Sequence, residues 1–199
     1  ATIYRDERIN RIFEGTNEIN RLLISGMTLK KSILEELPIR DAISKRLDDW
    51  LLEVSDTNNK LETVVEYFRS ACLYILNELI LKYGQDMKNN QWIIEPFSNM
   101  LCSLAAVDTG LKRVEKMSDE IKKKENMEIL ELSISQHFIA LNQEMDKILS
   151  HISNGEEEYN QKNKVINRYK ESLDYYPDEI NLMKNVVETL YKHGKYYLD

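Results

Sequence analysis

The residues best suited to chemistry lie together near the start of the chain, at Glu14-Gly15-Thr16. A glycine beside a carboxylate lets a ligand approach the backbone closely, so Glu14 is placed like a general base. Thr16, Asn17 and Glu18 would then open a helix, where free N–H groups and the helix dipole favour anionic or carbonyl groups. A dinucleotide or a thioester would suit such a site. The alternative is a plain helix junction, in which Thr16 caps the second helix and Glu14 is solvated.

The other reactive side chains form no comparable pattern. His137, His151 and His193 are far apart, and no HxxxH or HExxH spacing occurs, so we expect no metal site. Cys72 and Cys102 have no CxxC spacing. We therefore expect both cysteines to be buried thiols in a reducing compartment.

Composition excludes several classes of protein. The chain has 199 residues, 42% hydrophobic and 31% charged, enough for a sizeable core and unlike disordered or fibrous proteins. Its net charge of −7 disfavours nucleic-acid binding. No apolar run reaches the ~18–20 residues of a membrane helix, so we predict a soluble, cytoplasmic protein. The basic run Lys122-Lys123-Lys124 is expected to be a solvated helix end with a favourable dipole interaction, rather than a membrane contact.

The composition indicates that these residues are held in place by long elements with few connections between them. The 6 glycines and 3 prolines fall far below the combined share of roughly 12% in an average protein. Apolar residues recur at helical spacing along most of the chain. This periodicity predicts helices at residues 1–13, 17–34, 39–54, 60–83, 91–122, 127–152, 156–174 and 177–193. The stripe at 60–83 is the cleanest, and the polar segment 156–174 is expected at the surface.

The predicted fold class is all-α, an antiparallel helical bundle preceded by a helix–loop–helix arm. Pro38 marks the boundary between an arm of residues 1–38 and a bundle of residues 39–199, which we expect to fold without the arm. The arm has an apolar face that needs a packing partner, formed by Ile9, Ile12, Phe13, Leu22 and Leu23. The last third is rich in tyrosine, which suits either an interface or ordinary packing: Tyr169, Tyr175, Tyr176, Tyr191, Tyr196 and Tyr197.

The segment around Glu14 also carries a family resemblance. Arg-Asp-Glu-Arg-Ile at 5–9 runs into Ile-Phe-Glu-Gly-Thr-Asn-Glu-Ile at 12–19. Residues 4–36 resemble the carboxy-terminal signature of the acyl-CoA dehydrogenases, flavoenzymes that introduce the α,β double bond into fatty acyl-CoA thioesters. The later helices resemble, by position and pattern, the additional carboxy-terminal helical domain of very-long-chain acyl-CoA dehydrogenases and their bacterial relatives. The resemblance and the first residue, Ala1 rather than Met, predict a fragment of a longer protein.

The resemblance implies a role for each residue of the motif. Glu14 would remove the α-proton of the thioester while a hydride leaves the β-carbon for FAD. Gly15 would contact the substrate, and Thr16, Asn17 and Glu18 would contact the adenosine side of FAD. Some relatives carry the base on another helix, but Glu14 here implies the common arrangement. Most of the flavin pocket lies outside this sequence, so the chain alone is expected to be inactive and to bind no FAD.

The resemblance also implies partners for the parent protein: an acyl-CoA substrate, an electron-transfer partner and further copies of itself in a homo-oligomer. Two alternatives stay open. The parent could be an acyl-CoA oxidase or another flavin oxidase on the same scaffold. The bundle after residue 38 could instead be a structural and oligomerisation module, a role compatible with either enzyme class.

Overall fold

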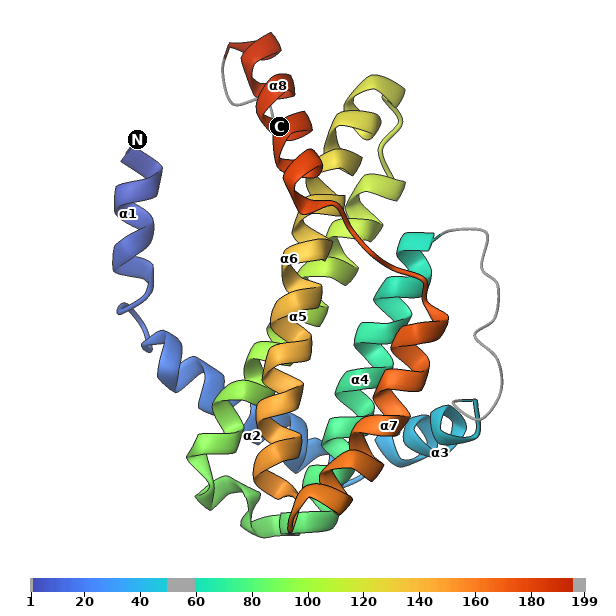
Figure 1. The fold of residues 1–199 in the computed structure, drawn as a ribbon. Coiled ribbons are helices and arrows are strands. Elements are labelled where there is room, and N and C mark those ends of the chain that lie inside the picture. Colours follow the sequence, from blue (N-terminus) through green and yellow to red (C-terminus); the bar gives the residue numbers. More distant parts are fainter. Residues whose placement is uncertain (1, 50–59, 195–199) are drawn as a thin grey trace.

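The computed structural model describes residues 2–49 and 60–194, which form helices and connecting turns (Figure 1). The α-helices are α1 (Thr2–Asn10), α2 (Asn17–Ile33), α3 (Ile39–Asp49), α4 (Lys60–Tyr83), α5 (Gln91–Glu115), α6 (Glu120–Ile152), α7 (Glu156–Ser172) and α8 (Glu179–His193). A 3₁₀-helix, η1 (Gly84–Asn89), joins α4 to α5. The described residues contain no strand, so the predicted all-α class is confirmed. The predicted helical residues 50–54, Tyr196 and Tyr197 lie outside the described residues.

Helices α4, α5 and α6 form the centre of the bundle, and the other elements pack around them. Contacts join α2 to α5, α3 and α7 to α4, and α8 to α6. In Figure 1, α8 rests on the part of α6 that extends beyond α4 and α7. The core is built from the apolar stripes that the periodicity predicts, and its largest fully buried side chains are Tyr67, Phe68, Phe97, Ile75, Leu79, Met87, Ile93, Met100, Ile134, Leu141, Ile148 and Leu149.

An aromatic cluster joins α4, α6 and the segment from α7 onward. The ring of Tyr67 lies 5.4 Å from that of Phe138 and stacks on Tyr169 at 5.5 Å. Tyr175 meets Phe138 edge-on at 5.2 Å. The buried Tyr67 hydroxyl donates a hydrogen bond of 2.7 Å to Oδ1 of Asn142, and burial raises the pKa of this tyrosine. Two of the tyrosines in the last third, Tyr169 and Tyr175, therefore serve ordinary packing.

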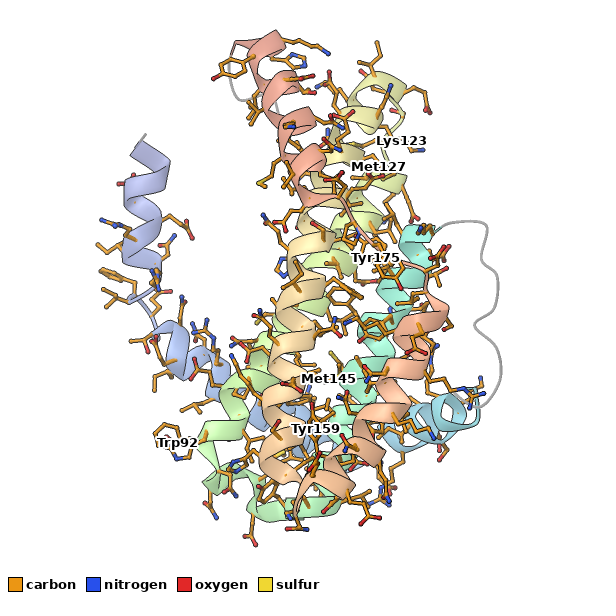
Figure 2. The ribbon with its side chains drawn as sticks, viewed as in Figure 1. Trp92, Lys123, Met127, Met145, Tyr159 and Tyr175 are labelled. Atoms are coloured by element: carbon orange, nitrogen blue, oxygen red, sulfur yellow. The ribbon has the colours of Figure 1, made fainter. Side chains whose placement is uncertain are left out.

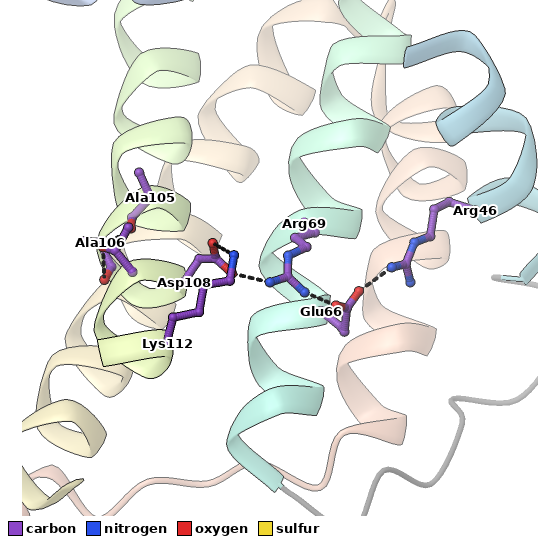
Figure 3. Close-up of polar contacts among 8 residues, drawn as sticks. Arg46, Glu66, Arg69, Ala105, Ala106, Asp108 and Lys112 are labelled. Carbon is purple, nitrogen blue, oxygen red and sulfur yellow. Dashed lines mark hydrogen bonds and ion pairs between the residues drawn. The ribbon is translucent and has the colours of Figure 1, made fainter. Parts of the chain in front are cut away.

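A row of charged side chains links three helices across the partly exposed side of α4 (Figure 3). Glu66 on α4 accepts hydrogen bonds from Arg46 of α3 and from Arg69, one turn further along α4. Arg69 also reaches Asp108 of α5, which pairs with Lys112 at 2.6 Å. The Lys112 hydrogen bond, with the help of Arg69, lowers the pKa of the Asp108 carboxyl. This row fixes α3 and α5 relative to α4.

One predicted helix boundary is wrong. The expected helix over 91–122 ends at Glu115, and a new helix begins at Glu120 rather than near residue 127. The side chain of Asp119 caps α6 by accepting hydrogen bonds from the backbone N–H groups of Ile121 (3.0 Å) and Lys122 (3.1 Å). The apolar spacing of Val114, Met117 and Ile121 continues across this turn, so periodicity alone predicts an unbroken helix here.

Two further expectations need correction. Cys72 is buried on α4, as predicted, but Cys102 is exposed on α5. Cys102 lies beside the apolar stripe of α5, on a part of the helix that no other element covers. The basic run Lys122-Lys123-Lys124 lies in the first turns of α6, so it meets the positive end of the helix dipole and not the favourable negative end.

The first helix stands away from the bundle. In Figure 1, α1 projects from the end of α2, with open space between it and α8. The apolar side chains of the junction are largely exposed: Ile9 by 54%, Ile12 by 70% and Phe13 by 62%. The need for a packing partner, predicted from the apolar face of the arm, therefore applies to α1, to the turn after it and to the side of α2 that carries Ile19 (55% exposed) and Leu23 (57%).

Candidate active-site segment

The predicted site residues occupy the turn between α1 and α2. Ile12 and Phe13 still donate backbone hydrogen bonds to the carbonyl of Ile9, at 2.9 and 3.0 Å. The chain then turns sharply, because Glu14 has a φ of 53° and Gly15 a φ of 110°. Both values lie in the region that L-residues rarely adopt, and Glu14 is one of three non-glycine residues with positive φ in the described part of the chain.

Gly15 is required here by conformation and by space. A Cβ atom at this position would lie 2.9 Å from Oδ1 of Asn20. The same Asn20 side chain donates a hydrogen bond of 3.0 Å to the Gly15 carbonyl oxygen. The turn is thus closed by the first turn of α2, whose Asn20 side chain occupies the space where a Cβ atom of residue 15 would lie.

The start of α2 is capped as predicted. The Thr16 hydroxyl accepts a hydrogen bond of 3.3 Å from the backbone N–H of Ile19, and the Asn17 N–H donates to the carbonyl of Arg11 at 3.1 Å. Hydrogen bonds from its own backbone N–H and from Thr16 lower the pKa of the exposed Glu18 carboxyl. Some backbone N–H groups at this helix end are therefore already hydrogen-bonded within the chain.

Glu14 itself points to no partner in this chain. Its side chain is exposed, and among the described residues it takes part in no hydrogen bond or ion pair. No described residue accepts a hydrogen bond from the backbone N–H of Glu14 or of Gly15. The turn therefore offers a free carboxylate and two adjacent backbone donors, which is the equipment for removing a proton beside a carbonyl group.

The orientation of this segment relative to the bundle is set by polar contacts between α2 and α5. Ser25, fully buried, donates to the carbonyl of Ile94 at 3.1 Å and pairs with the hydroxyl of Ser98 at 2.6 Å. Arg21 donates from Nε to Oδ1 of Asn99 at 2.7 Å. The sequence analysis did not single out these residues. The signal was present as small polar residues, Ser25 and Ser98, between the apolar stripes of two predicted helices.

A groove of about 340 Å³ and a second of about 290 Å³ flank the exposed indole of Trp92 on α5. Figure 2 shows Trp92 projecting from the bundle, and it is 90% exposed. The smaller groove lies beside the predicted cofactor contact Glu18 and includes Glu95, so its charged groups are carboxylates. Such a lining repels anions such as phosphate and suits hydroxyl donors.

Each histidine either contacts a neighbouring side chain or lies at the end of a helix. His137 lies 3.2 Å from the hydroxyl of Ser103, and burial lowers its pKa. His193 pairs with Glu125 at 2.9 Å, and His151 is exposed in the last turn of α6. Over residues 2–49 and 60–194, no three His, Cys, Asp or Glu side chains gather as a metal site would require. None of the helices described there has the length and apolar run needed to cross a bilayer.

The all-helical fold and the Glu14 turn can be compared with known proteins. No protein-family model matches the chain. A probable acyl-CoA dehydrogenase of Bacillus subtilis (strain 168) is 30% identical over 118 residues, covering 57% of this chain and 20% of that protein. The crystal structure of an acyl-CoA dehydrogenase complexed with FAD from Bacillus anthracis has a TM-score of 0.83 and 24% identity, covering 98% of this chain and 34% of that chain.

These similarities confirm the resemblance to acyl-CoA dehydrogenases. The sequence similarity to the B. subtilis protein extends over more than half of the chain, and the fold agrees with the B. anthracis structure over nearly all of it. The chain spans about a fifth of the length of the curated relative and about a third of the solved chain.

Proposed function

We propose that this chain is the part of an FAD-dependent acyl-CoA dehydrogenase that supplies the catalytic base, Glu14. The observation that carries the proposal is the free carboxylate on a left-handed turn, followed by Gly15 and a capped helix, within a segment that resembles the family signature. The proposed reaction converts a fatty acyl-CoA to a trans-2-enoyl-CoA. The similarity to two acyl-CoA dehydrogenases supports this assignment.

In the proposed reaction, the Glu14 carboxylate accepts the α-proton of the thioester. The backbone N–H of Glu14 donates a hydrogen bond to the thioester carbonyl, which stabilises the negative charge that develops on its oxygen. Gly15 has no side chain of its own, which would let the acyl-CoA approach the turn on the face that Asn20 does not cover. Bound FAD would accept the hydride that leaves the β-carbon, which completes the two-electron oxidation.

Thr16, Asn17 and Glu18 are the residues of this chain that would contact the adenosine side of FAD. Glu18 fits a ribose hydroxyl better than a phosphate, since its carboxyl is negatively charged and its pKa is lowered. The Asn17 N–H already donates a hydrogen bond to the carbonyl of Arg11, so Asn17 would contact the cofactor through its side chain. The segment provides a minority of the contacts that a dinucleotide needs, and we expect the isolated chain to bind no FAD.

The test is Glu14→Gln in the full-length parent enzyme, because the amide keeps the shape of the side chain but cannot accept the proton. We expect dehydrogenation to fall by about 10²–10⁴-fold, while flavin absorbance and thioester binding stay close to wild type. Glu35→Gln is the matched control, since Glu35 is also exposed with a positive φ of 59° but lies at the end of α2, away from the turn. Near-normal turnover of Glu14→Gln would disprove the assignment of the base.

The remaining roles belong to the parent enzyme as a whole. We propose an acyl-CoA substrate, an electron-transfer partner and a homo-oligomeric, cytoplasmic enzyme. A structural and assembly role for the bundle is the second candidate function. It is supported by the exposed apolar side chains on α8, a helix that packs on α6.

A further inference from the structure

The inner face of α8 is held on α6 by polar contacts along its length. Gln136 of α6 donates to Glu179 at 3.3 Å, and Thr189 donates to Glu128 at 3.3 Å. Near the end of α8, His193 pairs with Glu125 of α6 at 2.9 Å. Thr189 is also buried, so the side of α8 that carries these residues packs on the bundle.

The outer face of α8 is also apolar. Four side chains spaced at i, i+3, i+7 and i+11 form one stripe, which we call the outer stripe: Ile180 (64% exposed), Met183 (41%), Val187 (46%) and Tyr191 (82%). Leu182, Val186 and Leu190 of α8 are partly buried. Apolar residues thus occur on the packed side of α8 as well as on its outer face, which is typical of a helix covered on both sides. In Figure 1 no other element of the described residues lies on the side of α8 that faces away from α6.

The charges beside the outer stripe are self-complementary. Lys184 and Glu188 follow one another by a helical turn along the same edge of the stripe. Neither forms an ion pair within the described chain. If two copies of α8 lie antiparallel about a twofold axis near residue 186, Lys184 of one copy lies opposite Glu188 of the other, and the pair occurs twice. Ile180 of one copy then meets Tyr191 of the other across the same axis.

We propose that α8 is a dimerisation helix, which packs its outer stripe against the outer stripe of a second copy of this chain in an antiparallel, twofold pair. A twofold contact places the same surface on both copies, so it requires a surface that complements itself. The apolar stripe and the alternating charges along its edge meet this requirement. One helix pair buries less than the roughly 1,600 Å² of a standard interface, so the dimer is weak and concentration-dependent.

The test measures the sedimentation coefficient of this chain over a range of concentrations. We expect Lys184→Glu to raise the dimer dissociation constant at least tenfold, because it places like charges opposite each other twice. The double variant Lys184→Glu/Glu188→Lys restores both pairs and should return the dissociation constant to within about threefold of wild type. Lys164→Glu on exposed α7 is the matched control and should leave it unchanged. Circular dichroism checks that each variant is folded.

Three outcomes would overturn the proposal. The first is a wild-type chain that stays monomeric at the highest concentration. The second is a dimer that survives Lys184→Glu, or one that the charge-swapped double variant fails to restore. The third is a dimer that is abolished by Leu23→Ser in the arm but not by the α8 variants, since this would place the contact on α2. The inference rests on the assembly role proposed for the bundle. None of these results depends on dehydrogenase activity, so the assignment of Glu14 as the base is tested separately.

Discussion

Glu14 and Gly15 are consecutive residues with positive φ, and the chemistry proposed for the turn depends on this conformation. A left-handed conformation costs an L-residue about 1–2 kcal/mol, which is more than the turn gains from the hydrogen bond between Asn20 and Gly15 at its net value. Strain of this kind is concentrated at functional sites. The strained position of Glu14 therefore agrees with the role proposed for its carboxylate.

We predict that Gly15→Ala loosens the start of α2. The new Cβ atom would collide with Asn20 and the backbone would be strained by about 1–3 kcal/mol. Backbone amides in the first turn of α2 should then exchange about tenfold faster or more in hydrogen–deuterium exchange. Gly26→Ala in the same helix is the control, because a Cβ there meets nothing within 4 Å and should stabilise α2 by about 0.5–1 kcal/mol. Equal exchange in both variants would contradict this account of the turn.

The two cysteines should differ sharply in reactivity. Burial raises the pKa of the Cys72 thiol to about 12, whereas Cys102 is exposed. A thiol reagent at pH 8 should label one cysteine in the folded chain and two in denaturant, and Cys102→Ser should abolish labelling of the folded chain. Because the raised pKa favours the protonated folded state, the contribution of Cys72 to stability is full below its ordinary pKa of about 9 and is lost as the pH rises towards 12. Thermal unfolding of the wild-type chain and of Cys72→Ala at pH 8 and pH 11 separates this loss from that of the buried tyrosines, whose pKa values are also raised.

At the scale of elements, the fold depends on how α4 joins its neighbours. The aromatic cluster ties α4 to α6 and α7, and the charged row ties it to α3 and α5. The aromatic rings are mostly buried, so their contribution is insensitive to salt. The charged row is partly exposed, so solvent screens it and its contribution must be modest.

We predict that Arg69→Gln destabilises the chain by about 1 kcal/mol at low salt, since it removes the centre of the charged row. Arg69 is 33% exposed, and the difference from wild type should shrink in 1 M NaCl. It should also shrink at acid pH. The pKa of Asp108 is lowered in the fold, so this carboxyl stabilises above its ordinary value of 3.8 and loses its contribution as the pH falls through the lowered pKa.

The control for this measurement is Arg40→Gln. Arg40 pairs with Glu35 at 3.2 Å, but the two side chains are 73% and 70% exposed, so no measurable change in the denaturant midpoint is expected. Equal losses in the Arg69 and Arg40 variants would mean that the links of Arg69 to α5 and Glu66 add nothing to the fold.

At the scale of the whole molecule, the division of the chain at Pro38 stays a prediction. The sequence predicts a bundle that folds without the first 35 residues. In the structure, α1 stands apart but α2 lies along α5, where Leu29 joins the core and Ser25 is fully buried. These contacts assign α1 and α2 to different parts of the fold, although both belong to the predicted arm.

We predict that removing residues 1–13 leaves the midpoint of thermal unfolding within a few degrees of wild type. Removing residues 1–35 should lower it markedly, because the buried surface of α5 around Ile94 and Ser98 becomes exposed. Calorimetry of both truncated chains measures the two midpoints. If they are the same, α2 adds nothing to the bundle and the boundary at Pro38 is correct.

Local patterns in the sequence predicted most of the helices and the capped turn. The apolar spacing of 60–83 reproduces α4, and Gly15 and Thr16 have the positive φ and the cap expected of them. These features depend on neighbouring residues, whose preferences act through a few bonds and one or two helical turns. The same locality explains the error at 116–119, where the apolar spacing continued and outweighed the cap signal of Asp119.

Other properties were decided only when distant segments packed together. The exposure of Cys102, the burial of Ser25 against Ser98 and the open outer face of α8 depend on which side of each helix a neighbour covers. A helical stripe shows that a helix has an apolar side, but the partner and the rotation of the helix against it follow from the packing of the whole chain. The sequence thus determined the elements and the local conformation of the Glu14 turn, while the tertiary structure determined which surfaces remain available for binding.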